Sequence, residues 1–184
     1  MRSLFEQFQH YGQQWPDEGG TPHFIELLAN GEHSFLREAR DAHFTGSAWL
    51  VSVDGERVLL THHRKLGRWL QLGGHADGDM DLARVALREA EEESGLDDLD
   101  VLPEMFDLDR HRIPARGDEP EHWHYDVRYV VRCGENEDFV VSEESHALAW
   151  RNIREIAGDA GSDASLQRMA RKWLQQSVRS APCA

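Results

Sequence analysis

Long hydrophobic runs are missing from this sequence. No apolar stretch approaches the roughly eighteen residues of a membrane-spanning helix. Residues 1–15 also lack the continuous apolar segment of a secretory signal peptide. We therefore expect no membrane partner and a cytoplasmic location.

Cysteine is scarce as well, since Cys133 and Cys183 are the only two among 184 residues. Two widely spaced cysteines provide neither a disulfide framework nor a zinc-binding signature. Their scarcity is consistent with a reducing compartment.

Basic residues are few relative to acidic ones. The chain has 20 Lys and Arg residues against 34 Asp and Glu residues, which gives a formal net charge of −14. Such an acidic surface repels the phosphate backbone of nucleic acids, so we expect no nucleic-acid partner. A small phosphorylated ligand remains compatible with this charge if cations are supplied locally.

Residues 1–45 have the pattern of helices. Leu4, Phe8 and Tyr11 recur at helical spacing, and Thr21-Pro22 is typical of a helix start. We expect a third short helix over residues 34–41. This region is predicted to be a helical extension that packs on the main domain or contributes to a homodimer.

Residues 46–184 alternate between strand-like and helix-like patterns. SAWLVSV and RVLLTHH are strand-length apolar runs joined by Asp54-Gly55, a hairpin signal, and RWLQL follows as a short strand. A helix is predicted over residues 81–94. Further strands are expected in LDVLPEMFDL, HWHYDVRYVVRC and HALAWRNI, before an amphipathic C-terminal helix. The order predicts an α/β domain with a mixed sheet and helices on its faces.

The helix over residues 81–94 has an unusual charge pattern. At about 100° per residue, Leu82, Val85 and Ala86 form an inward stripe. The same stripe continues into three carboxylates at i, i+3, i+4 spacing: Glu89, Glu92 and Glu93. Glu91 points away from them.

Three carboxylates in this position repel one another, and they lie at the end of the helix where the macrodipole disfavours anions. A hard divalent cation such as Mg²⁺ would remove both problems, because it prefers oxygen ligands. The alternative is a solvated acidic helix face, and the periodicity alone leaves both interpretations open.

The sequence GHADGDMDLARVALREAEEESGL resembles the signature of the Nudix hydrolase family, G-x5-E-x7-R-E-U-x-E-E-x-G-U, where U is aliphatic. The matching residues are Gly74, Arg88, Glu89, Glu92, Glu93, Gly95 and Leu96. One fixed position departs from the signature, because Met80 stands where the family has its first glutamate.

The resemblance implies an α/β/α sandwich in which Glu89, Glu92 and Glu93 hold Mg²⁺ or Mn²⁺ and Arg88 orients a carboxylate. It also implies that the backbone at Gly73 and Gly74 approaches substrate phosphates. Such enzymes often take a further acidic residue from a later loop. Glu143 and Glu144 are the candidates here, and Glu144 competes with Glu89 for the role of general base.

Two further groups are candidate substrate contacts. Arg64 and Arg68 belong to a basic cluster at residues 62–68 and could clamp phosphate, although a solvated turn explains them equally well. His122, His124 and Asp126 alternate on one strand face and, together with His75, could line a pocket or add metal ligands. The alternative for this second group is a polar strand side that faces solvent.

We predict metal-dependent hydrolysis of a diphosphate linkage in a nucleoside diphosphate joined to another group, such as a nucleotide sugar, dinucleotide or nucleoside triphosphate. Met80 motivates one alternative, a nucleotide-binding module without activity. The histidines motivate a second alternative, a diphosphate isomerase on the same scaffold, for which Cys133 and Cys183 are poorly placed nucleophiles.

Overall fold

The computed structural model describes residues 2–18, 20–64, 67–141 and 145–180. Within these residues the strands are β1 (Ala42–Val51), β2 (Arg57–His63), β3 (Arg68–Leu70), β4 (Leu72–His75), β5 (Leu99–Ile113), β6 (His122–Cys133) and β7 (Ser145–Asn152). The α-helices are α1 (Leu4–Gln14), α2 (Thr21–Leu28), α3 (Leu82–Ser94), α4 (Ile153–Gly158) and α5 (Ala164–Ser180). Two short 3-10 helices are η1 (Pro16–Glu18) and η2 (Gly31–Phe35).

The strands form one mixed sheet in the order β3-β2-β1-β6-β5. Strand β1 is its centre, since it pairs in parallel with β6 over its whole length. Its other edge is shared, because Thr45–Ala48 pair with β4 whereas Val51 pairs with β2. Strand β7 pairs with β2. The predicted α/β class with a mixed sheet is confirmed.

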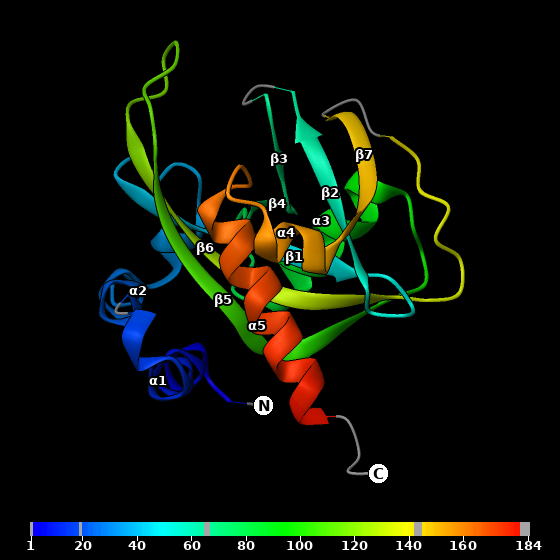
Figure 1. Cartoon of the computed structure of the whole chain (residues 1–184). Helices are drawn as coiled ribbons and strands as arrows, with labels where there is room; N and C mark the ends of the chain where they lie inside the picture. The colour runs from blue at the N-terminus through cyan, green and yellow to red at the C-terminus, as the bar shows by residue number, and fades with distance from the viewer. Residues whose placement is uncertain (1, 19, 65–66, 142–144, 181–184) are drawn as a thin grey trace.

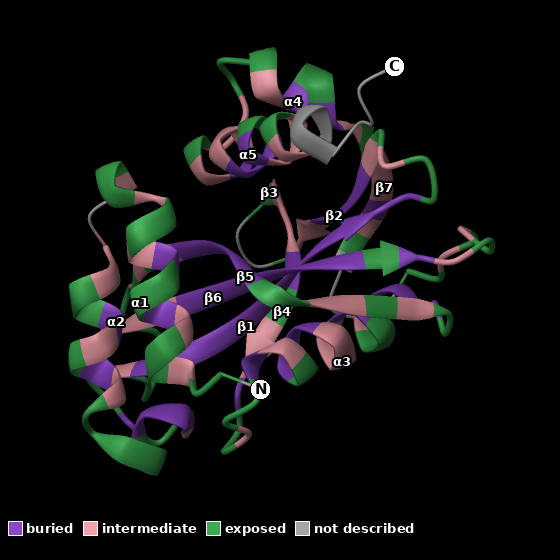
Figure 2. Cartoon of the chain, turned by 90° about the horizontal axis from the view of Figure 1, so that it is seen from below, coloured by how far each residue is buried: buried purple, intermediate pink, exposed green. Residues whose placement is uncertain are grey.

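Helices cover both faces of this sheet (Figure 2), with α3 on one side and α4 with α5 on the other. Alternation along β1 explains the two layers. Ala48 and Leu50 pack in the apolar cluster that includes Ala90 of α3. Trp49 and Val51 point the other way, into a cluster with residues of α4 and α5. The result is an α/β/α sandwich, as predicted.

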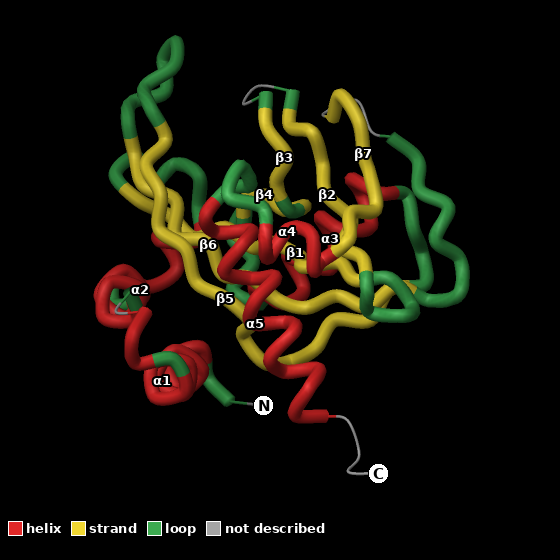
Figure 3. Tube along the Cα trace, viewed as in Figure 1, coloured by secondary structure: helices red, strands yellow, loops and turns green. Residues whose placement is uncertain are grey.

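The N-terminal helices lie beside the long β5–β6 hairpin (Figures 1 and 3). Phe8 and Tyr11 of α1 and Phe24 of α2 are buried against Phe44 of β1 and Val127 of β6. The extension thus shares a core with the sheet. None of the helices among the described residues is long and apolar enough to cross a membrane.

Three details of the predicted elements are wrong. Residues 34–41 do not form a helix, because the chain makes the 3-10 helix η2 and then turns into the sheet. Strand β1 begins at Ala42 rather than Gly46, because β6 supplies partners from Ala42 onward. RWLQL is split at Gln71, since β3 pairs with β2 whereas β4 pairs with β1.

Candidate active site

Helix α3 begins and ends as its sequence predicts. Asp81 is the N-cap, and its carboxylate accepts a hydrogen bond from the backbone N–H of Arg84 at 3.2 Å. Gly95 ends the helix in a left-handed conformation with a φ of 71°. No basic residue lies in the last turn, so the helix itself leaves the carboxylates there uncompensated.

The buried face of α3 differs from the prediction in one respect. Beyond Ala86 it continues through Ala90 and Ser94, which are both buried. Glu89 and Glu93 lie on the flank of this face and are half-buried, and the side chain of Glu92 is 65% exposed. The carboxylates therefore lie beside the core, with Glu92 exposed and the Glu89 side chain only 16% exposed, because residues at i+4 spacing keep the apolar row continuous.

The flank with Glu89 and Glu93 faces the backbone of β4. The N–H of Gly73 donates a hydrogen bond to Glu93 Oε1 at 2.7 Å. At Gly74, an added Cβ would lie 2.6 Å from Glu89 Cδ, which is closer than real Cβ atoms approach. The glycine pair thus lets the strand lie directly against two carboxylates.

Arg88 contacts both the carboxylates of α3 and the backbone of β4. Its guanidinium donates to the carbonyl of His75 at 3.0 Å and to Glu89 Oε1 at 2.9 Å. Its Nε lies 4.0 Å from Glu92 Oε1. The hydrogen bond with Glu89 raises the pKa of Arg88 above its ordinary value. Arg88 is therefore a permanent cation that positions Glu89 relative to β4.

The donors in this group fit a hard divalent cation. They are carboxylate oxygens from three side chains on one helix flank, of which that of Glu92 is exposed to solvent. Arg88 supplies one positive charge against three negative ones. The remaining charge is of the kind that Mg²⁺ or Mn²⁺ neutralises.

The loop before α3 contains aspartates that are already paired. Arg37 donates two hydrogen bonds of 2.7 Å to Asp77, and this pairing lowers the pKa of the carboxyl. Asp79 is bound in the same two-pronged manner by Arg84. Met80 is 47% exposed. The carboxylates nearest to Met80 in sequence therefore have structural partners of their own.

The residues predicted to contact substrate differ in their exposure and in their partners. Arg64 is exposed in the turn after β2, and Arg68 forms an ion pair with Asp163 at 3.2 Å. Asp126 is only 2% exposed. Its carboxylate accepts hydrogen bonds from Thr45, Ser47, Gln71 and Arg128.

The expectation that Asp126 faces a substrate is therefore wrong, because its oxygens are occupied by protein donors in the interior. Asp126 is a buried residue of β6 whose carboxylate is hydrogen-bonded to Thr45 and Ser47 of β1. Glu143 and Glu144 lie outside the described residues.

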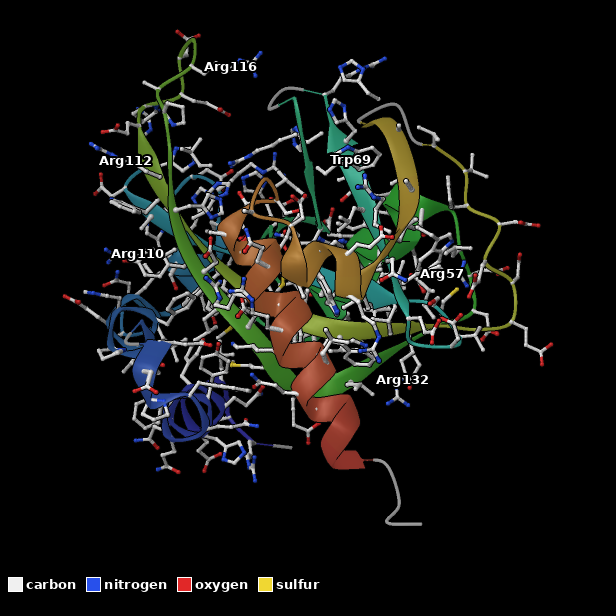
Figure 4. All side chains as sticks on the ribbon, viewed as in Figure 1. Arg57, Trp69, Arg110, Arg112, Arg116 and Arg132 are labelled. Atoms are coloured by element: carbon white, nitrogen blue, oxygen red, sulfur yellow. The ribbon has the colours of Figure 1, made fainter. Side chains whose placement is uncertain are left out.

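The predicted histidine group is present and larger than expected. His75, His122 and His124 surround His43, which is buried in β1. Sequence reasoning missed His43, because its partner strand is far away in the chain. Its alternation with Thr45 and Ser47 was the available signal. The group lies toward the outer part of the β5–β6 hairpin, along which Arg110, Arg112 and Arg116 project (Figure 4).

Comparison with known protein families matches residues 43–174 to the NUDIX domain. No curated protein matches the chain significantly. Among solved structures, an Ap4A hydrolase binary complex from C. elegans has a TM-score of 0.59 and 17% identity, over 74% of this chain and 98% of that one. A NUDIX family hydrolase from Clostridium perfringens has a TM-score of 0.51 and 21% identity, over 73% and 97%.

A MutT protein from Methanosarcina mazei Go1 has a TM-score of 0.53 and 19% identity, over 73% of this chain and 94% of that one. At these identities the likeness concerns the fold. The family match covers most of the 184 residues and includes the whole of α3 with its carboxylates. This chain therefore belongs to the NUDIX family of pyrophosphohydrolases, which generally use a divalent metal.

Proposed function

We propose that this protein hydrolyses the diphosphate linkage of a nucleoside diphosphate joined to another group, with Mg²⁺ or Mn²⁺ as cofactor. Nucleotide sugars, dinucleotides and nucleoside triphosphates make up the substrate class. The observation that carries the proposal is the contact between the carboxylates of Glu89 and Glu93 and the backbone of Gly73 and Gly74.

Each residue of this group has a role that follows from its position. Glu89, Glu92 and Glu93 would hold the cation, which supplies electrostatic stabilisation for the charge that develops on the phosphate oxygens. Gly73 and Gly74 have no side chains that would keep a diphosphate away from the carboxylates. The other proposed substrate contacts are His75, Arg64, Arg68, His122 and His124.

Arg88 is a positioning residue, because it fixes Glu89 against β4 through the carbonyl of His75. Glu89 and Glu144 are the two candidates for the base that takes a proton from the attacking water. The pH profiles of Glu89→Gln and Glu144→Gln would separate them, since loss of the base removes the acidic limb of the profile in only one variant.

The test is a pair of matched variants on one helix. Glu92→Gln removes a proposed cation ligand, and Glu91→Gln removes an exposed neighbour that points elsewhere. With Mg²⁺ and a panel of nucleotide sugars, dinucleotides and nucleoside triphosphates, we expect Glu92→Gln to lower kcat/KM by at least about 100-fold. Glu91→Gln should stay within about threefold of the wild type. Dinucleotides are included because one structural neighbour is an Ap4A hydrolase.

Absence of cleavage across the panel, with Glu92→Gln indistinguishable from wild type, would contradict the proposal. If nucleotides then raised the melting temperature without turnover, the chain would be a binding module. The isomerase alternative is not favoured. Cys133 is buried at the end of β6, its thiol donates to the carbonyl of Asn136, and burial raises its pKa. Cys183 lies outside the described residues.

A further inference from the structure

His43, His75, His122 and His124, from three strands, meet at one end of the sheet, and His111 of β5 packs beside His124 with ring centroids 5.5 Å apart. The strand register explains the meeting, because His43 of β1 is the Cα partner of His124 in β6, and Thr45 is the partner of His75 in β4. The ring centroid of His43 lies 5.1 Å from that of His75, 5.0 Å from His122 and 4.8 Å from His124. His43 is thus the centre of the group.

The imidazole of His43 presents an unused lone pair to this group. His43 is 3% exposed, and its Nδ1 lies 3.1 Å from the carbonyl of Ala39. Because a carbonyl only accepts hydrogen bonds, Nδ1 carries the proton and Nε2 carries the lone pair. That Nε2 is buried and has no hydrogen-bond partner. A histidine that donates from one nitrogen to a backbone carbonyl and leaves the other bare has the arrangement of a metal ligand.

Two neighbours place their own ligand atoms near this lone pair. One nitrogen from each of His43, His75 and His124 lies within 4.8 Å of the other two. A tetrahedral Zn²⁺ with bonds of about 2.0–2.1 Å separates its ligands by roughly 3.3 Å, so small rotations of the rings would close the site. His122 flanks it, with Nδ1 2.9 Å from the carbonyl of Pro120 and Nε2 3.1 Å from Nε2 of His124.

The surroundings of the rings also suit a metal ligand. Burial lowers the pKa of His75 to about 4 and that of His124 to about 2, and it also lowers the pKa of His43. Burial thus favours the uncharged imidazole, which is the form that binds a metal.

We propose that His43, His75 and His124 form a binding site for one divalent cation of the Zn²⁺ class, separate from the carboxylate site on α3. The donors are imidazole nitrogens only, and such a set favours Zn²⁺ and similar transition metals over Mg²⁺. His75 and His124 are half-buried and His43 is buried, so an ion would reach the site from the side of His75 and His124. The backbone of Gly74 links this site to the carboxylates.

The experiment measures zinc binding and does not require activity. Full-length protein is stripped with a chelator and dialysed into excess Mg²⁺ to saturate the carboxylate site. It is then titrated with Zn²⁺ by calorimetry, and bound metal is quantified. We expect one Zn²⁺ per chain. The His75→Gln/His124→Gln variant should bind at least about 100-fold more weakly.

Two matched controls separate this site from other histidines and from the carboxylates. His10→Gln changes an exposed histidine of α1 and should bind Zn²⁺ like the wild type. Glu92→Gln should also keep the zinc site. The proposed hydrolysis can therefore fail while zinc binding is observed, and zinc binding can fail while hydrolysis is observed. Circular dichroism verifies that each variant is folded.

The imidazole NMR signals of the wild type provide a readout that needs no variant. Addition of one equivalent of Zn²⁺ should shift the signals of His43, His75 and His124 and leave that of His10 unchanged. Zinc binding that disappears in Glu92→Gln but persists in the folded double variant would overturn the proposal. So would a wild type that binds no Zn²⁺ at micromolar concentration or shows no shift of these three rings.

Discussion

Gly74 shows how a single missing side chain supports the proposed chemistry. An alanine Cβ there would push against the carboxylate of Glu89, which is the far end of a flexible side chain and can rotate away. We therefore expect Gly74→Ala to change the free energy of unfolding by less than about 1 kcal/mol. Activity should fall on the order of 100-fold, because a displacement of about 1 Å at a catalytic group is enough for such a loss.

Steady-state kinetics and thermal unfolding of the same preparation measure both effects of Gly74→Ala. Gly158→Ala is a suitable control, because no atom lies within 4 Å of its added Cβ and its φ is not positive. Full activity in Gly74→Ala would show that the position of Glu89 does not limit the reaction.

Met80 permits a second residue-scale prediction. Its side chain is 47% exposed, and Arg88 is already bound by Glu89 and the carbonyl of His75. A glutamate at this exposed position would keep much of its contact with water, where its charge has little effect on stability. We expect Met80→Glu to leave kcat/KM within about threefold of the wild type and stability within about 0.5 kcal/mol. A rate increase of about 100-fold would instead mark the natural site as degenerate.

At the residue scale, local spacing predicted which glutamates of α3 share a side of the helix, but it placed them on the buried face, which continues instead through Ala90 and Ser94. The common flank of Glu89, Glu92 and Glu93 follows from helical spacing alone, and the structure shows Arg88 beside two of them. The role of Asp126 could not be predicted in the same way. Its burial depends on Arg128 and on residues of β1 some eighty positions earlier, and strand alternation does not tell a buried polar face from an exposed one.

At the scale of elements, Gly46 determines how closely α3 approaches β1. A Cβ at this position would lie 2.8 Å from Val85 Cγ1 and 3.0 Å from the carbonyl oxygen of Leu82. Backbone cannot move aside as a flexible side chain can. We expect Gly46→Ala to destabilise the protein by about 1–3 kcal/mol, measured by urea unfolding.

A double variant tests this explanation of Gly46→Ala. Val85→Ala removes the nearest obstructing atoms, so Gly46→Ala/Val85→Ala should be more stable than the sum of the two single changes implies, by roughly 1 kcal/mol. Strict additivity would mean that the two elements do not meet where the structure has them in contact.

Element boundaries were predicted well where end signals are strong. Asp81 and Gly95 define α3, and Asp54-Gly55 joins β1 to β2. The prediction failed where the pairing partner decides the boundary. Gln71 divides β3 from β4 because the two short strands pair with different neighbours, and no residue between Arg68 and Leu72 signals this.

At the scale of the whole molecule, a buried charge network joins the two ends of the chain. Lys172 of α5 is 3% exposed and contacts both Glu18, at the N-terminal side, and Asp107 of β5. Asp107 also pairs with Arg128 and Arg168. The 3-10 helix η1 and helix α5 are thus joined to each other and to strand β5. The sequence predicts helix α5 but not this link, because it depends on contacts more than 150 residues apart.

Asp107→Asn would leave the three cations around it with less compensation. Removing one partner from a buried ion pair costs about 3–5 kcal/mol, and we expect a loss of this size near neutral pH. Chemical unfolding of the wild type and the variant measures it. Asp54→Asn is the control, since its carboxylate is largely exposed and its loss should cost less than about 1 kcal/mol.

The pH dependence of this difference tests the same network. Burial alone would raise the pKa of Asp107, but the hydrogen bond from Arg168 and the charges of Arg128 and Lys172 hold it below its ordinary value. The unfolded chain therefore takes up this proton at a higher pH than the folded protein, and acid removes the stabilisation. We expect the stability gap between wild type and Asp107→Asn to stay constant above about pH 5 and to shrink below about pH 4.

Buried neutral histidines lower the stability of both proteins alike in acid, so the difference in free energy of unfolding between the two proteins reports on Asp107 alone. A gap that persists unchanged at about pH 2, with both proteins still folding cooperatively, would show that Asp107 is not stabilised as an anion.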